Sequence, residues 1–144
     1  MRFMMMYRPD SNMETAPPPA PEHMAAMGAF VEEMIKSGVL LATDGLQPMS
    51  KGARVRRTRS SVTVTDGPFV EAKELIGGYA VVQAASKDEA IELAKRFLAV
   101  AGDGETEIRQ IFEAADFPPC LVSPEDIARE QALREEMQRR AAVR

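Results

Sequence analysis

The strand predicted over residues 2–8 places the strongest limit on how this chain can fold. Side chains alternate along a β-strand, and here both sides are apolar. Phe3, Met5 and Tyr7 lie on one side, and Met4 and Met6 lie on the other. A strand that is apolar on both faces has to be covered twice. In a chain of 144 residues the helices of one domain can cover one face, so we predict that a second copy of the chain covers the other.

The spacing of apolar residues along the rest of the chain predicts an α+β domain. In chain order we predict a strand at 2–8, a helix at 22–37, a strand at 39–43, a hairpin with arms at 54–58 and 61–65, a strand at 76–84, a helix at 86–98 and a strand at 105–114. The inner face of the first helix is predicted to consist of Met24, Met27, Val31, Met34 and Ile35. Ser86 and Glu89 form a capping box that opens the second helix. This order is the split βαβ pattern of the ferredoxin-like fold, with an inserted β-hairpin.

Helix-start signals recur near the C-terminus. Ser123 can cap a helix that begins at Pro124, with acidic residues in its first turn. The large apolar residues of this helix, which is predicted to run to about residue 142, are Ile127, Leu133 and Met137. We therefore predict an α+β domain over residues 1–119 and a C-terminal helical extension over residues 120–144. The extension is either a solvated appendage or a helix that docks a partner.

Composition narrows the class of protein. Lys and Arg number 18 against 22 Asp and Glu, and a net charge of −4 argues against a nucleic-acid binder. Cys120 is the only cysteine, which excludes an intrachain disulfide and suits the reducing cytoplasm. No segment approaches the roughly 20 apolar residues of a membrane span. One His and one Cys make no zinc site, and no dinucleotide fingerprint indicates a cofactor.

The only histidine, His23, stands in the first turn of the first predicted helix. An imidazole has an ordinary pKa of about 6.5, which suits proton transfer at neutral pH. A helix N-terminus favours its neutral, proton-accepting form. A base of this kind needs an orienting carboxylate, and Asp44 and Asp66 each end a predicted strand. The alternative is a first-turn histidine that is exposed to solvent.

The predicted hairpin carries five cations within residues 51–59. Arg54 and Arg56 face the same side of an extended chain. Arginine forks can capture a carboxylate or a phosphate. A charged edge hairpin that resists strand addition is the simpler interpretation.

The segment Asp66-Gly67-Pro68-Phe69 interrupts the second arm of the hairpin. Turn chemistry accounts for Gly67 and Pro68, and Phe69 is predicted to pin the turn to the core. The carboxylate of Asp66 is predicted either to stabilise this turn or to point into a pocket. Tyr79 is predicted to be largely buried on a central strand, with its hydroxyl hydrogen-bonded.

Two stretches resemble the DGPF-bearing, YCII-related proteins. The first comprises residues 66–74 followed by Gly77-Gly78-Tyr79, and the second comprises residues 38–41 followed by residues 45–48. The resemblance extends from residue 1 to about residue 117. It implies a ferredoxin-like protomer that pairs with a second copy as a dimeric α+β barrel.

The resemblance also implies a pocket with a His–Asp pair, and His23 occupies the matching helix-start position. Relatives commonly carry Gly-Glu-Gly where this chain has Thr43-Asp44-Gly45, so the acid is shorter here by one methylene. Some relatives of this barrel type cleave or isomerise small ring compounds. DGPF domains also occur beside extracytoplasmic-function sigma factors.

We therefore expect a homodimeric, YCII-like small-molecule enzyme or binder that needs no cofactor. His23, with Asp44 or Asp66, is expected to assist proton transfer in an isomerisation, elimination or lactone-type reaction. The candidate ligand-binding residues are Phe69, Arg54 and Arg56. The alternative is a non-catalytic ligand-sensing or regulatory module whose C-terminal helix docks another protein. A half-buried His23 beside a carboxylate favours the enzyme, and a solvated His23 favours the module.

Overall fold

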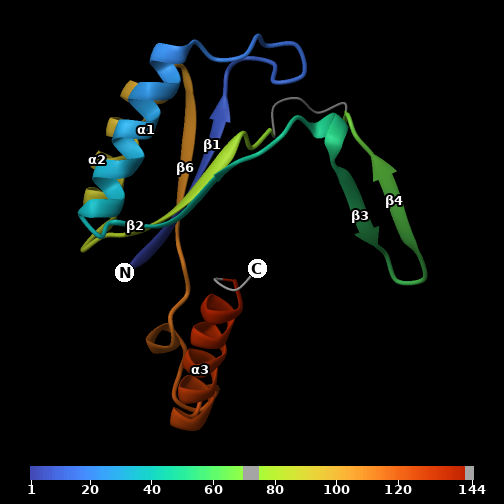
Figure 1. Cartoon of the computed structure of the whole chain (residues 1–144). Helices are drawn as coiled ribbons and strands as arrows, with labels where there is room; N and C mark the ends of the chain where they lie inside the picture. Colours follow the sequence, from blue (N-terminus) through green and yellow to red (C-terminus); the bar gives the residue numbers. More distant parts are fainter. Residues whose placement is uncertain (70–74, 142–144) are drawn as a thin grey trace. The chain divides into compact units, whose positions relative to one another are not determined.

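A computed structural model describes residues 1–69 and 75–141 of the chain (Figure 1). Residues 70–74, which belong to the DGPF-like stretch, lie outside the described residues. The chain divides into two compact units, Met1–Ile111 and Phe112–Arg144. Each unit is therefore considered separately.

The first unit is built on a four-stranded antiparallel sheet in the order β2-β5-β1-β6. The strands are β1 (Arg2–Pro9), β2 (Leu40–Gly45), β5 (Gly78–Gln83) and β6 (Gly104–Gln110). The first strand lies inside the sheet and pairs with both β5 and β6. With α1 and α2 as the two crossover helices, this order is that of the ferredoxin-like fold, which confirms the predicted fold class.

Both helices begin and end at signals that the sequence carries. Helix α1 (Pro21–Lys36) has proline at its first position. Its C-cap is Ser37, and the φ of 72° at the following Gly38 permits the N–H of Val39 to reach the carbonyl of Met34 at 3.1 Å. Helix α2 (Lys87–Ala101) is capped by Ser86, whose Oγ accepts a 3.2 Å hydrogen bond from the N–H of Glu89. The predicted Ser86 cap is thus confirmed, whereas the Glu89 carboxylate accepts from the N–H of Ala85, at 2.6 Å, and not from that of Ser86 as the predicted capping box requires.

The two helices cover one face of the sheet and form the core with it (Figure 1). The sheet contributes Phe3, Met5 and Val82, and the helices contribute Met34, Ala90, Leu93 and Ala94. The predicted inner face of α1 was partly wrong, because Met24 and Ile35 are 57% and 59% exposed. The face that meets the sheet is centred on Met34, while the half-buried Phe30, which the prediction left out, packs against the core. Met24 and Ile35 each lie one residue away from the positions whose helical spacing brings them to the sheet, so their side chains point outward.

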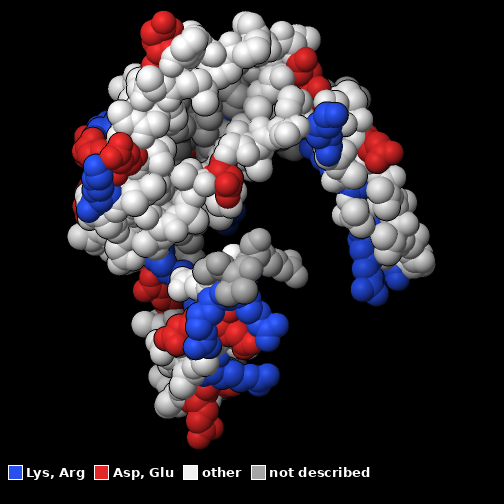
Figure 2. Space-filling view, viewed as in Figure 1, with Lys and Arg blue, Asp and Glu red and all other residues white. Residues whose placement is uncertain are grey.

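The inserted hairpin forms a separate two-stranded sheet from β3 (Ala53–Arg57) and β4 (Val62–Asp66). Its register confirms that Arg54 and Arg56 share a face, opposite Thr65 and Thr63. Figure 2 shows Lys and Arg side chains gathered along this hairpin. Every residue in its two strands is exposed. The hairpin therefore adds charge to the surface and little to the core.

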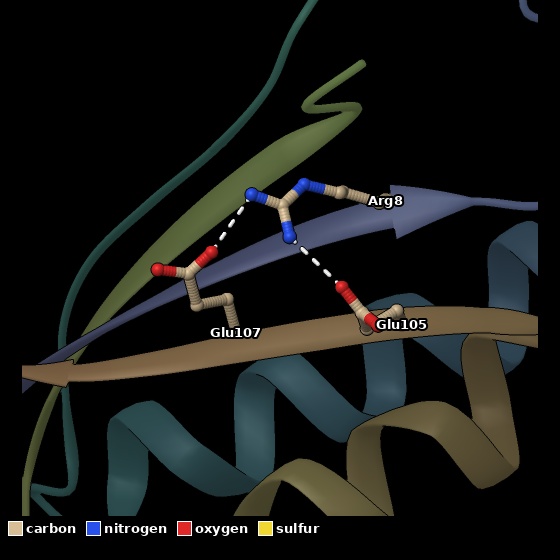
Figure 3. Close-up of polar contacts among 3 residues, drawn as sticks. All are labelled: Arg8, Glu105 and Glu107. Atoms are coloured by element: carbon tan, nitrogen blue, oxygen red, sulfur yellow. Dashed lines mark hydrogen bonds and ion pairs between the residues drawn. The ribbon is translucent and has the colours of Figure 1, made fainter. Parts of the chain in front are cut away.

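The sheet face away from the helices is half-buried and carries both apolar and charged groups. Met4 and Met6 lie on this face, opposite Val81 and Tyr79 of β5. Arg8 reaches across to β6, where its guanidinium donates to Glu105 at 2.8 Å and to Glu107 at 2.7 Å (Figure 3). Tyr79, which was predicted to be largely buried, is half-buried on this face, and its hydroxyl is hydrogen-bonded as predicted.

One further departure from prediction concerns the end of the last strand. The strand predicted to reach residue 114 ends at Gln110, and a short 3-10 helix, Ala114–Asp116, follows. The N–H of Glu113 donates to Asp116 Oδ2 at 2.8 Å, so this local cap competes with continuation of the strand. In the second unit, helix α3 (Pro124–Ala141) is preceded by Ser123, whose Oγ accepts a 3.1 Å hydrogen bond from the N–H of Asp126, as predicted. The predicted boundary between residues 119 and 120 stays a prediction.

Candidate functional site

A cavity of about 470 Å³ lies between the helix pair and the sheet of the first unit. This volume is within the range of small-molecule sites, which are mostly apolar with a few polar groups. Its larger apolar lining residues are Met5, Met27, Phe30, Val31, Met34, Leu40, Val82, Leu93 and Phe97. Its polar lining residues are Tyr7, His23, Thr43, Asp44, Tyr79 and Thr106. The composition suits a compact ligand that is fixed by few hydrogen bonds.

Strand register explains why the cavity exists. Gly45, Gly78, Tyr7 and Thr106 form one row across all four strands, and all four line the cavity. The two glycines leave the β2 and β5 half of this row without side chains. A Cβ atom on Gly45 would meet no atom within 4 Å, so the space above it is open.

His23 stands in the first turn of α1, is half-buried and lines the cavity. The imidazole makes no hydrogen bond or ion pair with any residue that the structure describes. Both ring nitrogens are therefore left for a ligand or for solvent. Helix α1, which carries His23, packs against β2, the strand that ends at Gly45.

Asp44 is the predicted carboxylate that lines the same cavity as His23. It pairs with Tyr79 across β2 and β5, and the Tyr79 hydroxyl donates to Asp44 Oδ2 at 2.9 Å. This hydrogen bond, with the negative charge of Asp44, raises the pKa of Tyr79. The register directs both side chains to the face away from the helices, and Asp44 has no hydrogen bond with His23.

Asp66 ends β4 opposite Ala53, is exposed and is not among the residues that line the cavity. The neighbouring Gly67 has a packing role, because a Cβ there would lie 1.8 Å from the carbonyl oxygen of Met49. The N–H of Gly67 also donates to the carbonyl of Gly52 at 2.9 Å. The turn interpretation of Gly67 thus has a direct structural basis.

The predicted ligand-binding residues Phe69, Arg54 and Arg56 lie on the hairpin and the turn after it, outside the cavity lining. The Arg54 guanidinium carbon lies 4.2 Å from the centroid of the Phe69 ring. This is a cation–π contact within the protein. Arg56 is exposed.

Sequence reasoning left out Tyr7 and Thr106 as site residues. Tyr7 packs edge-on against Phe97 at 5.2 Å, and its hydroxyl donates to the carbonyl of Asp103 at 3.2 Å. Burial, with the charges of Asp10 and Asp103, raises the pKa of Tyr7. Thr106 Oγ1 is buried and has no hydrogen-bond partner within the described part of the chain. The alternation of side chains along β6 could have predicted which face of the sheet Thr106 lies on. It could not have predicted that Thr106 lies in one row with Tyr7 and the two glycines, because that depends on the register between strands.

Residues 1–69 and 75–141 contain no group of three or more His, Cys, Asp or Glu residues that could hold a metal ion. Across the same residues, no helix has the length and apolar character that a bilayer crossing requires.

Comparisons with known proteins complete the description of the site. The chain is 32% identical over 72 residues to an uncharacterised protein of Rhizobium meliloti (strain 1021), a match that spans 50% of this chain and 58% of that protein. It is similar to the structure of 5-chloro-2-hydroxyhydroquinone dehydrochlorinase from Burkholderia phenoliruptrix AC1100, solved with 2,5-dihydroxybenzoquinone. That likeness has a TM-score of 0.42 and 16% identity, and covers 82% of this chain and 100% of the other. The sequence profile of the YCII-related domain matches residues 1–115, and the chain belongs to this family.

Proposed function

We propose that this protein is a small-molecule enzyme or binder with one ligand cavity in each protomer. The observation that carries the proposal is the cavity of about 470 Å³ with His23 in its lining. A catalytic or binding site is most often a concave, mainly apolar pocket with a few polar groups. Proton transfer by His23 needs no cofactor.

His23 is the residue that we assign to proton transfer. A neutral imidazole can take a proton from a ligand carbon or hydroxyl and return it at a second position, as isomerisation, elimination and lactone-type reactions require. Asp44 is the carboxylate that we assign to the site in preference to Asp66, because Asp44 lines the cavity. The Asp44 carboxylate is directed to the other face of the sheet and accepts from Tyr79, so we assign it no direct contact with His23.

The test is a thermal-shift and turnover screen of small carboxylates and ring compounds with the whole chain. His23→Ala is expected to keep the melting temperature within about 2 °C, because a half-buried first-turn residue contributes little packing. It should also abolish the turnover or binding found for the unaltered protein. Asp66→Asn is the matched control outside the cavity lining and should change neither quantity. Turnover that persists in His23→Ala would contradict the assignment of His23 while leaving the binding cavity in place.

We also infer a homodimer in which the face away from the helices is covered by a second copy. Met4, Met6, Val81 and Tyr79 supply half-buried apolar surface there. Arg8, held by Glu105 and Glu107, lies on the same face. An obligate interface of this kind is apolar at its centre and polar at its rim.

A reducing compartment such as the cytoplasm suits the exposed thiol of Cys120.

The alternative is a ligand-sensing or regulatory module, and the second compact unit favours it. Phe112, Phe117 and Leu121 are 71%, 41% and 72% exposed in this unit, and apolar surface of this kind can mark a docking site. Deleting residues 123–144 should leave the α+β domain folded, as a cooperative melt would show. A truncated chain that retains turnover favours the enzyme. Loss of cooperative melting would mean that the extension completes the core.

A further inference from the structure

The polar group of the cavity that most needs a partner is the hydroxyl of Thr106. Its Oγ1 is buried, and it has no hydrogen-bond partner among the described residues. Valine has nearly the same shape and would fill the position without an unpaired polar atom. A buried hydroxyl without a partner costs free energy because it has given up its hydrogen bonds to water. Such an atom in the lining of a cavity indicates that its partner comes from the cavity.

The other hydroxyls in the lining are already used. Thr43 Oγ1 donates to the carbonyl of Tyr79 at 2.9 Å, and the Tyr7 hydroxyl donates to the carbonyl of Asp103 at 3.2 Å. The Tyr79 hydroxyl donates to Asp44. Thr106 is therefore the lining hydroxyl with both its donor and its acceptor capacity free for a ligand.

The position of Thr106 gives the cavity two polar ends. Thr106 lies on β6, near Phe97 and Ala101 of α2, since α2 packs against β6. His23 lies on α1, which packs against β2 at the opposite edge of the sheet. Between His23 and Thr106 the cavity is lined mainly by apolar side chains, and the space above Gly45 is open.

We propose that Thr106 is a specificity-determining residue that hydrogen-bonds a neutral hydroxyl or carbonyl group on the ligand. This inference rests on the proposed function, because it requires that the cavity hold a small molecule. The ligand is a compact apolar molecule with one polar group at Thr106 and its reacting atoms toward His23. The polar group is neutral because no Lys or Arg lines the described cavity to balance an anion.

The experiment compares 2-naphthol with 2-methylnaphthalene, which differ by a hydroxyl in place of a methyl group. The protein contains no Trp, so naphthyl fluorescence reports binding without interference. The unaltered protein is expected to bind 2-naphthol about tenfold more tightly, the effect of one good hydrogen bond. Thr106→Val should remove this preference and leave the affinity for 2-methylnaphthalene unchanged. Thr106→Ser, which retains the hydroxyl, should keep the preference.

Two controls separate the role of Thr106 from general effects on the cavity. Thr43→Val removes a hydroxyl of the same size from the same lining, and should keep the tenfold preference because that hydroxyl already has a partner. Gly45→Ala puts a methyl group into open space and should weaken both probes alike. Without a probe, Thr106→Val should melt at a higher temperature than the unaltered protein, because it removes an unpaired buried hydroxyl.

The outcomes distinguish the two proposals. If the unaltered protein binds both probes equally and Thr106→Val changes neither affinity, the role of Thr106 is wrong and the binding cavity stands. A lower melting temperature for Thr106→Val also contradicts this role, since the hydroxyl would then have a partner within the protein, such as a trapped water. If neither probe binds, the small-molecule function of the cavity fails, and the role of Thr106 fails with it.

Discussion

The two faces of the sheet differ in how far their apolar side chains are buried, although β1 carries large apolar residues on both. On the helix-covered face, Phe3 and Met5 of β1 are 1% and 6% exposed. On the other face, Met4 and Met6 are only half-buried. Both sets of side chains are large and apolar, so the difference lies in what covers them. The two helices of one protomer cover one face, and the other face stays partly exposed within the protomer.

The faces also differ in how they treat polar groups. On the open face, the two terminal nitrogens of Arg8 donate to Glu105 and Glu107. The covered face keeps a cavity and leaves Thr106 Oγ1 without a partner in the described chain. Arg8 also keeps one buried nitrogen, Nε, without a partner among the described residues, so incomplete pairing occurs on both faces. We propose a ligand as the missing partner only for Thr106, because Thr106 lines the cavity.

The largest expected effect is on assembly. Met4→Glu puts a carboxylate at the centre of the open face, and each dimer would bury two of them. Arg109 is the cross-strand partner of Met4, so in a single protomer the new carboxylate lies beside a cation. The substitution is therefore expected to affect the interface more than the fold of the protomer. We expect light scattering at micromolar concentration to change from a dimer to a monomer of 15.8 kDa. An unaltered protein that is already monomeric would refute the proposed interface.

The next effect is on the covered face. Phe3→Ala should lower the free energy of unfolding by about 3–5 kcal/mol, as expected for a fully buried aromatic residue. The measurement is a denaturant titration in the Met4→Glu background, where the open face is solvated. Met6→Ala, in the same background, is the control and should cost less than half as much. Equal losses for the two variants would mean that the two faces are equally packed within one protomer.

The two tyrosines of the chain report the faces separately, with Tyr7 on the covered face and Tyr79 on the open one. Both have a raised pKa, Tyr7 mainly through burial and Tyr79 mainly through its hydrogen bond to Asp44. Since the neutral phenol is favoured in the folded state, each contributes stability that is present below the unfolded pKa of about 10 and is lost as pH rises through the folded pKa. Ultraviolet titration should show that both phenols ionise at a higher pH than an ordinary tyrosine.

Asp44→Asn should lower the pKa of Tyr79 toward its ordinary value and leave that of Tyr7 unchanged, because the carboxylate is the main cause of the first shift only. The variant also lies in the cavity lining, so binding is measured separately. A Tyr7 pKa that moves with the Asp44 substitution would show that the two faces are coupled. A Tyr79 pKa that does not move would contradict the hydrogen bond.

The smallest expected effect comes from a residue that belongs to neither face of the sheet. Gly28 is exposed on α1, and a Cβ there would meet no atom within 4 Å. Gly28→Ala should raise the free energy of unfolding by about 0.5–1 kcal/mol through helix propensity alone. Mass and probe affinity should not change. A loss of stability in thermal melts would indicate that another surface packs on this side of the helix.

Local signals predicted much of the fold. The alternation of Arg2–Pro9, the Ser86 cap and the helix stop at Gly38 each act within a few residues, and each appears in the structure as expected. The two faces of β1 were also predictable, because a period of two needs no partner to be seen. The end of β6 was not predicted, since the apolar run through Ile111 and Phe112 continued the strand pattern while the cap at residues 113–116 ended it.

The sequence by itself determined the order of the elements, the covered and uncovered faces, and His23 as the single candidate base. It left Asp44 and Asp66 as alternatives and did not indicate Thr106. Only the tertiary structure put Asp44 in the cavity lining and Asp66 on the hairpin. It also aligned Gly45, Gly78, Tyr7 and Thr106 in one row. The physical reason is that periodicity is local, whereas a cavity depends on the register between strands that are far apart in the chain.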